Sequence, residues 1–209
     1  MSDELRFHDD TITPNGPWTT FAATTAGRGP LEYFHSAMEY VDGNDAKGRQ
    51  AIDLGCGGGA DSRALLARGW KVLAVDAEPG SERLLTAGLS PEHRALLEIT
   101  IGAFHEVKLV PADLVYAQFS LPFAGEHFEQ SVRAALGAVT EGGAFVGQLF
   151  GAHDDWVAEE GAVVVDHLWV EKSLSDFAHV DIDERQYDAP YGTANQTRHF
   201  HFFHIRARR

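Results

Sequence analysis

A glycine-rich stretch between two aspartates is the part of this sequence best suited to chemistry. The stretch is DLGCGGG, residues 53–59, and it follows a short apolar run and precedes a segment rich in helix-forming residues. Glycines at such a strand-to-helix turn let the backbone approach a ligand closely, and the amides at the start of the helix favour negative charge. Asp76 follows the next apolar run. The arrangement predicts a cofactor site at the carboxyl ends of two neighbouring strands.

Two classes of cofactor fit these residues. Gly55, Gly57 and Ala60 match the alanine variant of the dinucleotide fingerprint, and Asp76 lies where a ribose-binding acid belongs. In that case Asp53 would lie beside a pyrophosphate and repel it, because charges interact strongly in a low-dielectric cleft. The same carboxylate suits a cofactor that carries an ammonium and a sulfonium. The residues therefore favour the second class and leave a nicotinamide-dependent dehydrogenase as the alternative.

Two histidines near the end of the chain could accept a proton. His199 and His201 are two residues apart and share one face of a predicted strand, while Phe200, Phe202 and His204 share the other. Imidazole titrates near neutral pH, so His201 and His199 are the candidate catalytic bases, with packing or hydrogen bonding as the alternative role. Their spacing fixes no third metal ligand, and we therefore expect no metal site.

Apolar runs that alternate with helix-like segments must position these residues. Strands are expected over residues 50–54, 71–75, 97–101, 113–119, 144–150, 180–187 and 198–206. Helices are expected over residues 31–41, 60–68, 81–87 and 173–178, with further helices starting near residue 91 and ending near residue 139. Asp61 and Ser62 are placed to cap the helix that Gly69 ends, and residues 141–143 are expected to form a turn.

Strands that alternate with helices at this spacing predict βαβ units and a mostly parallel sheet. Only the turn-rich residues 188–197 separate the last two strands, so those two should pair in an antiparallel manner. The fold class expected is therefore α/β, a doubly wound sheet that is mostly parallel and has an antiparallel C-terminal strand.

The composition of the chain limits the classes of partner that it can bind. The 209 residues suit one domain, and 31 acidic against 17 basic side chains give a net charge of −14, which would repel a nucleic-acid backbone. There is no apolar run of the length needed for a secretory signal or a membrane span. Cys56 is the single cysteine, which fits a reducing compartment. We expect a cytoplasmic monomer or homodimer with no nucleic-acid or membrane partner.

Several stretches resemble one family. AIDLGCGGG followed by VLAVDAEP resembles the first two cofactor motifs of class I S-adenosylmethionine-dependent methyltransferases. ADLVYAQFSLPF, GGAFVGQLFG, DDW and RHFHFFHIRAR resemble a bacterial subgroup of small-molecule methyltransferases related to the tellurite-resistance enzymes. The resemblance implies a Rossmann-like single domain over residues 1–209, with an N-terminal helical lid segment (1–45) and a core (46–209). It also implies methyl transfer from S-adenosyl-L-methionine to a small molecule by in-line displacement.

The resemblance also implies roles for individual residues. Asp53 would orient the amino group of the cofactor, and Asp76 would accept hydrogen bonds from both ribose hydroxyls. Ala103 occupies the place of an acid that binds adenine in many relatives, so that contact shifts to the backbone beside Phe104. The remaining positions implied to border the cofactor are Gly55, Cys56, Gly57, Gly59, Ala77, Glu78 and Gln118. Cys56 itself is expected to be a small buried side chain rather than a nucleophile.

The acceptor would meet the methyl group near residues 118–123, which include Phe119 and Phe123. Trp18 and Phe21 are further candidate substrate-binding residues, because they precede the sheet, where family members often carry a lid, and their rings would attract a sulfonium. Packing in the core is the alternative role. Arg28 could pair with the carboxylate of the cofactor or remain a solvated loop residue. A non-catalytic S-adenosylmethionine-binding sensor stays open beside the methyltransferase and the NAD(P)-dependent oxidoreductase.

Overall fold

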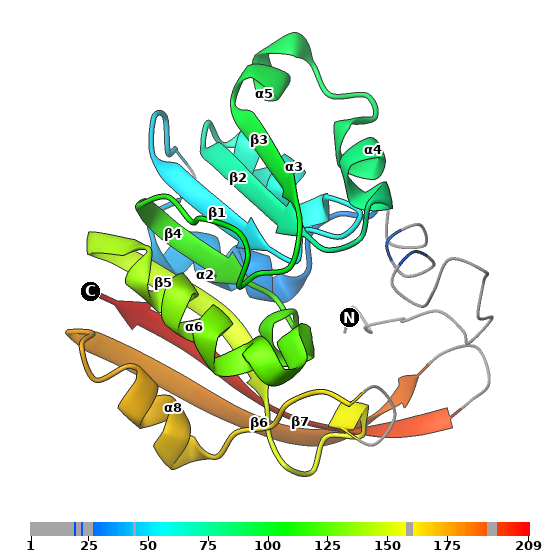
Figure 1. Ribbon diagram of the computed structural model, residues 1–209, viewed down its shortest axis with the longest axis vertical. Coiled ribbons are helices and arrows are strands. Elements are labelled where there is room, and N and C mark those ends of the chain that lie inside the picture. The colour runs from blue at the N-terminus through cyan, green and yellow to red at the C-terminus, as the bar shows by residue number, and fades with distance from the viewer. Residues whose placement is uncertain (1–18, 20–21, 23–26, 44, 158–160, 192–195) are drawn as a thin grey trace.

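One sheet of seven strands organises the chain. The computed structural model describes residues 19, 22, 27–43, 45–157, 161–191 and 196–209. The strand order is β3-β2-β1-β4-β5-β7-β6 (Figure 1). The strands are β1 (Gln50–Leu54), β2 (Lys71–Asp76), β3 (Leu97–Ile101), β4 (Ala112–Ala117), β5 (Val139–Phe150), β6 (His179–Tyr191) and β7 (Gln196–Arg208).

Strand direction follows the prediction. Strands β1 to β5 pair in parallel, whereas β7 runs antiparallel to both β5 and β6. The β6–β7 hairpin lies along one edge of the sheet (Figure 1). This arrangement confirms the α/β, Rossmann-like doubly wound sheet with an antiparallel C-terminal strand. The central strands are nearly continuous apolar runs because both of their faces are buried.

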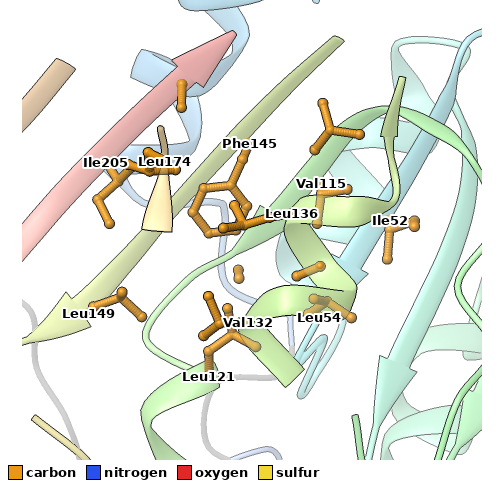
Figure 2. Close-up of a cluster of buried hydrophobic side chains, with 14 of the residues drawn as sticks. Ile52, Leu54, Val115, Leu121, Val132, Leu136, Phe145, Leu149, Leu174 and Ile205 are labelled. Carbon is orange, nitrogen blue, oxygen red and sulfur yellow. The ribbon is translucent and has the colours of Figure 1, made fainter. Parts of the chain in front are cut away.

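Helices cover both faces of the sheet. On one face, η1 (Leu121–His127), α6 (Phe128–Gly137) and α8 (His167–Ser173) contribute to one buried cluster. Figure 2 shows Leu121, Val132 and Leu136 in this cluster, beside Leu54 and Phe145 of the strands. The other face packs against α2 (Glu32–Tyr40), α3 (Ala60–Ala67) and α4 (Gly80–Thr86). None of the helices in the described ranges has the length and apolar character needed to cross a bilayer.

The ends of two helices show which local signals the chain uses. Ser90 caps α5 (Pro91–Ala95) by accepting a hydrogen bond from the His93 amide, as the sequence predicts. Gly69, with φ of +84°, ends the turn after α3, also as predicted. The predicted capping role of Ser62 is wrong, because its hydroxyl donates to Asp53 at 2.6 Å and Gly59 takes the cap position.

The structure corrects two boundaries. The turn predicted over residues 141–143 lies inside β5, where Ala112 pairs with Val139 and Leu114 with Ala144. Ala112 and Leu114 are two residues apart, whereas their partners Val139 and Ala144 are five residues apart. The extra residues, which include the glycines, form an irregularity in β5 that does not end the strand. The helix predicted over residues 173–178 lies earlier, at α8, because Asp166 accepts a hydrogen bond from the Trp169 amide and so fixes the first turn.

Candidate functional site

A cavity of about 290 Å³ opens at the carboxyl ends of the parallel strands. Its walls come from the segments that follow β1, β2, β3, β4 and β5, together with the start of β7 and residues before α2. The lining residues are Ala22, Arg28, Leu31, Gly55, Cys56, Gly57, Gly58, Ala60, Asp61, Asp76, Ala77, Glu78, Phe104, Gln118, Phe119, Ser120, Phe123, Phe150, Trp156 and Phe200. The location agrees with the rule that open α/β sheets bind ligands at this edge.

The glycine loop after β1 packs too tightly for other residues. Gly55 has φ of +82°, and a Cβ there would overlap the Cβ of Ser120 in the segment after β4. Gly59 has φ of +85°, and a Cβ there would come within 2.5 Å of the Leu85 side chain in α4. Both positions therefore require glycine for conformation and for space. Gly55 and Gly57 line the cavity as expected, whereas Gly59 serves packing behind it.

Asp76 is held with its carboxylate at the cavity. One oxygen accepts the Gly57 amide at 2.7 Å and the other accepts the Glu78 amide at 2.8 Å. Each oxygen keeps a lone pair free for a further donor. Ala77 and Glu78 line the cavity beside it, and Glu78 also accepts a hydrogen bond from Thr19. The structure thus brings these predicted residues together.

Two further aspartates of the loop region differ in access to the cavity. Asp53 is 3% exposed, accepts the Ser62 hydroxyl and lies behind the lining residues. Burial raises the pKa of its carboxyl to about 6, offset in part by the Ser62 hydrogen bond. Asp61, in the first turn of α3, does line the cavity. Burial, followed by the charge of Asp53, raises the pKa of the Asp61 carboxyl to about 8, while Arg28 opposes this.

Arg28 and Cys56, two further predicted cofactor-binding residues, also line the cavity. Burial lowers the pKa of the Arg28 guanidinium, and the charge of Asp61 acts in the opposite direction. Burial raises the pKa of the Cys56 thiol, which disfavours the thiolate that a nucleophile needs. Cys56 is 7% exposed and packs with the apolar cluster on the α2 and α3 side of the sheet.

Five aromatic rings, here called the aromatic box, line the cavity beyond β4. They are Phe119, Phe123, Phe150, Trp156 and Phe200. Phe123 meets Phe150 and Trp156 edge-on, with centroids 5.7 and 5.6 Å apart, and Phe119 stacks on Phe150 at 5.8 Å. Phe119 has φ of +49°, which is strained for a residue with a side chain. Such strain is typical of positions where function fixes the backbone.

The structure does not bring the predicted catalytic histidines to the cavity. Both are on the face of β7 opposite Phe200, so the predicted alternation is right and the cavity uses the other face. His201 is 5% exposed, its Nε2 lies 2.9 Å from Glu184, and its Nδ1 accepts the His153 amide. His199 pairs with Asp188 at 2.8 Å. Hydrogen bonding, the alternative role considered for them, describes both residues.

Three further predicted site residues are not among the described residues that line the cavity. Ala103 does not line the cavity, although its neighbour Phe104 does. Trp18 and Phe21 lie outside the described residues. Sequence reasoning missed Asp61 because it was assigned to capping, and missed Phe150, Trp156 and Phe200 because nothing local marks a ring as facing a cavity. Within the described ranges, no group of three or more potential metal ligands is found.

Comparisons with known proteins agree with this geometry. Residues 52–147 match the family described as methyltransferase domain. TehB from Haemophilus influenzae has a similar fold, with a TM-score of 0.70 and 14% identity over 93% of this chain and 68% of that one. No curated protein matches the sequence closely enough to be called a relative.

Two further solved structures have the same fold. The N-methyltransferase NodS from Bradyrhizobium japonicum, in complex with S-adenosyl-L-homocysteine, gives a TM-score of 0.57 and 12% identity over 91% of this chain and 97% of that one. The second is the 1,6-didemethyltoxoflavin-N1-methyltransferase from Burkholderia thailandensis, with bound 1,6-didemethyltoxoflavin and S-adenosylhomocysteine. It gives a TM-score of 0.58 and 16% identity over 85% of this chain and 78% of that one.

Proposed function

We propose that this chain is a class I S-adenosylmethionine-dependent methyltransferase and that it methylates a small apolar acceptor that binds in the aromatic box; the match to the methyltransferase-domain family supports the first part. In this proposal S-adenosyl-L-methionine is the cofactor, as the match to the methyltransferase-domain family supports, and the dinucleotide interpretation of the glycine stretch is set aside. The observation that carries the acceptor proposal is the position of the aromatic box, whose Phe119 and Phe123 belong to the segment that follows β4.

The cavity fits the cofactor. The loop after β1 lines the cavity at Gly55 and Gly57, and its Gly55 packs directly against Ser120. Arg28 Nε and Asp61 Oδ1 are shielded from solvent and have no hydrogen-bond partner within the described chain. Buried polar atoms usually have partners, so these two indicate a polar ligand at this end of the cavity. A zwitterionic amino-acid moiety supplies both charges that such a pair would bind.

Each part of the chain has a separate task in this proposal. The Asp76 carboxylate, oriented by Gly57 and Glu78, would accept the ribose hydroxyls. Arg28 would bind the carboxylate of the cofactor, and Glu78 with Phe104 would border the adenine. When bound, S-adenosylmethionine supplies a methyl group already activated on a sulfonium. The protein's remaining task is to align the acceptor and exclude water.

The aromatic box also limits the chemistry of the acceptor. The titratable side chains among the described lining residues follow β1 or β2, or precede α2, and so lie on the cofactor side. The box itself presents apolar rings, with Gln118 and Ser120 at its border. We infer that the acceptor is nucleophilic without help from a protein base, since no described side chain in the box could remove a proton from it. Aromatic rings favour flat, apolar molecules.

The test is transfer of a labelled methyl group from S-adenosylmethionine to a panel of apolar thiols, phenols, amines and oxyanions. We expect label in at least one acceptor, and Trp156→Leu should raise the KM for that acceptor without changing cofactor affinity. Trp169→Leu is the matched control, because Trp169 packs against the buried cluster beside α6, away from the cavity. Cofactor binding without turnover on any acceptor would instead identify a non-catalytic binding protein.

The compartment and the assembly state are also proposals. We propose a cytoplasmic location, because the single cysteine is buried and free and so fits a reducing compartment. We also propose that the protein is a monomer or a homodimer. Light scattering coupled to gel filtration would distinguish the two assembly states, and a larger assembly would contradict both.

A further inference from the structure

Asp61 is the unexpected polar group of the cavity. It lies in the first turn of α3 and lines the cavity, and its Oδ1 is shielded from solvent with no hydrogen-bond partner in the described chain. Leaving a carboxyl oxygen in this state costs free energy, so a partner that arrives with the ligand would recover that cost. The geometry therefore marks a place for a hydrogen-bond donor at the cofactor end of the cavity.

Asp53 is poorly placed for the same task. Its side chain is almost fully buried, one oxygen accepts the Ser62 hydroxyl at 2.6 Å, and it does not line the cavity. Its hydrogen bond ties β1 to α3 and thereby shapes the loop between them. Asp53 therefore supports the site from behind, whereas Asp61 faces the ligand.

The charges around Asp61 indicate that the donor is a cation. Asp53 adds negative charge next to Asp61, the Tyr116 side chain also interacts with Asp61, and Arg28, the cationic side chain among the described lining residues, acts in the opposite direction. Burial and the charge of Asp53 raise the pKa of the Asp61 carboxyl, which favours its protonated form while no cation is bound. A bound ammonium would favour the carboxylate and lower that pKa.

We propose that Asp61, rather than Asp53, binds the ammonium group of the cofactor's amino-acid moiety, and that the Asp61 carboxyl releases its proton when that ammonium binds. The inference rests on the proposed use of S-adenosylmethionine. In the step the carboxyl O–H bond breaks, the proton passes to solvent buffer, and the ammonium keeps its three protons and donates to the carboxylate. Arg28 then remains available for the carboxylate of the same moiety.

The first test compares two ligands by calorimetry. S-adenosylhomocysteine contains the amino-acid moiety, and 5′-methylthioadenosine has the same adenine, ribose and sulfur without it. Asp61→Asn should weaken S-adenosylhomocysteine binding by about tenfold or more, as expected for the loss of one charge-assisted hydrogen bond, and should leave 5′-methylthioadenosine binding unchanged. An equal loss for both ligands, or no loss for either, would overturn the proposal.

Asp53→Asn is the matched control. It removes a carboxylate of the same loop that does not line the cavity, so any loss of affinity should be the same for both ligands. A loss confined to S-adenosylhomocysteine in Asp53→Asn and absent from Asp61→Asn would assign the ammonium to Asp53 instead.

The second test measures the proton directly in the unaltered protein. Binding of S-adenosylhomocysteine at pH 7 should release about one proton, obtained from binding enthalpies in buffers of different ionisation enthalpy. The release should disappear in Asp61→Asn and should be absent when 5′-methylthioadenosine binds. No release from the unaltered protein would overturn the proposal. Failure of the unaltered protein to bind S-adenosylhomocysteine would instead contradict the proposed function.

Discussion

Gly55 shows how closely two sides of the cofactor site approach each other. Its backbone has a positive φ, and Ser120, whose hydroxyl donates to Leu54, lies directly against it. The loop after β1 and the segment after β4 thus pack on one another at the floor of the cavity. The absence of a side chain at this position is a structural requirement of the site.

Gly55→Ala should therefore destabilise the chain and weaken S-adenosylhomocysteine binding. The positive φ costs on the order of 1 kcal/mol for alanine, and the overlap with Ser120 should add about 1–3 kcal/mol. Gly88→Ala is the control, since Gly88 has φ of +73° and its added Cβ would meet nothing within 4 Å. Urea unfolding of both variants measures the difference, and equal losses of stability would contradict the close approach.

The residues of the site were predictable to different degrees. Gly55 and Asp76 carry local signals, because their spacing and their position at the ends of strands identify them, whereas no such signal marks Arg28, which precedes α2. Asp61 was hidden by its resemblance to a capping residue, and only its unpartnered oxygen sets it apart. The histidines of β7 were placed on the correct shared face, but a strand pattern does not say which face meets a cavity.

At the scale of elements, apolar runs and the turn-forming residues between them predicted most of the sheet. The strands and their directions follow from alternation with helices, since short connections leave few topologies. The failures occurred where a local signal was outweighed. The glycines at residues 142 and 143 stay within β5, because pairing with β4 and β7 on either side holds the strand. The helix α8 is set by Asp166, whose capping role was not recognised.

Asp166→Ala tests that explanation of α8. The Asp166 side chain accepts the Trp169 amide at 2.7 Å, and α8 places Val170 in the buried cluster under the sheet. Loss of the cap should lower the free energy of unfolding by about 1 kcal/mol. Asp176→Ala, an exposed aspartate after the same helix, is the control and should change little. Equal thermal midpoints for Asp166→Ala and the unaltered chain would show that packing alone sets the start of α8.

At the scale of the whole molecule, one sheet is shared by the two largest buried clusters of the described residues. Strands β1, β2, β4, β5 and β7 contribute residues to the cluster under α6 and α8, and β1, β2, β4 and β5 also contribute to the cluster under α2 and α3. Unfolding of the shared strands would therefore expose the buried side chains of both clusters to solvent. The cavity spans the carboxyl ends of the same strands, so ligand binding is coupled to the stability of the whole sheet.

Residues 1–209 should therefore unfold in one cooperative transition, as expected for a single domain. Far-UV circular dichroism and tryptophan fluorescence should give the same midpoint, since Trp70 is buried on one face and Trp169 packs on the other. S-adenosylhomocysteine at about 100 times its Kd should add about 2.7 kcal/mol and raise that midpoint by roughly 5–10 °C. Asp76→Asn should lose most of this shift, because its carboxylate is the group proposed to bind the ribose. Two separate transitions, of which the ligand moves only one, would contradict both the single domain and the coupling of the cavity to the sheet.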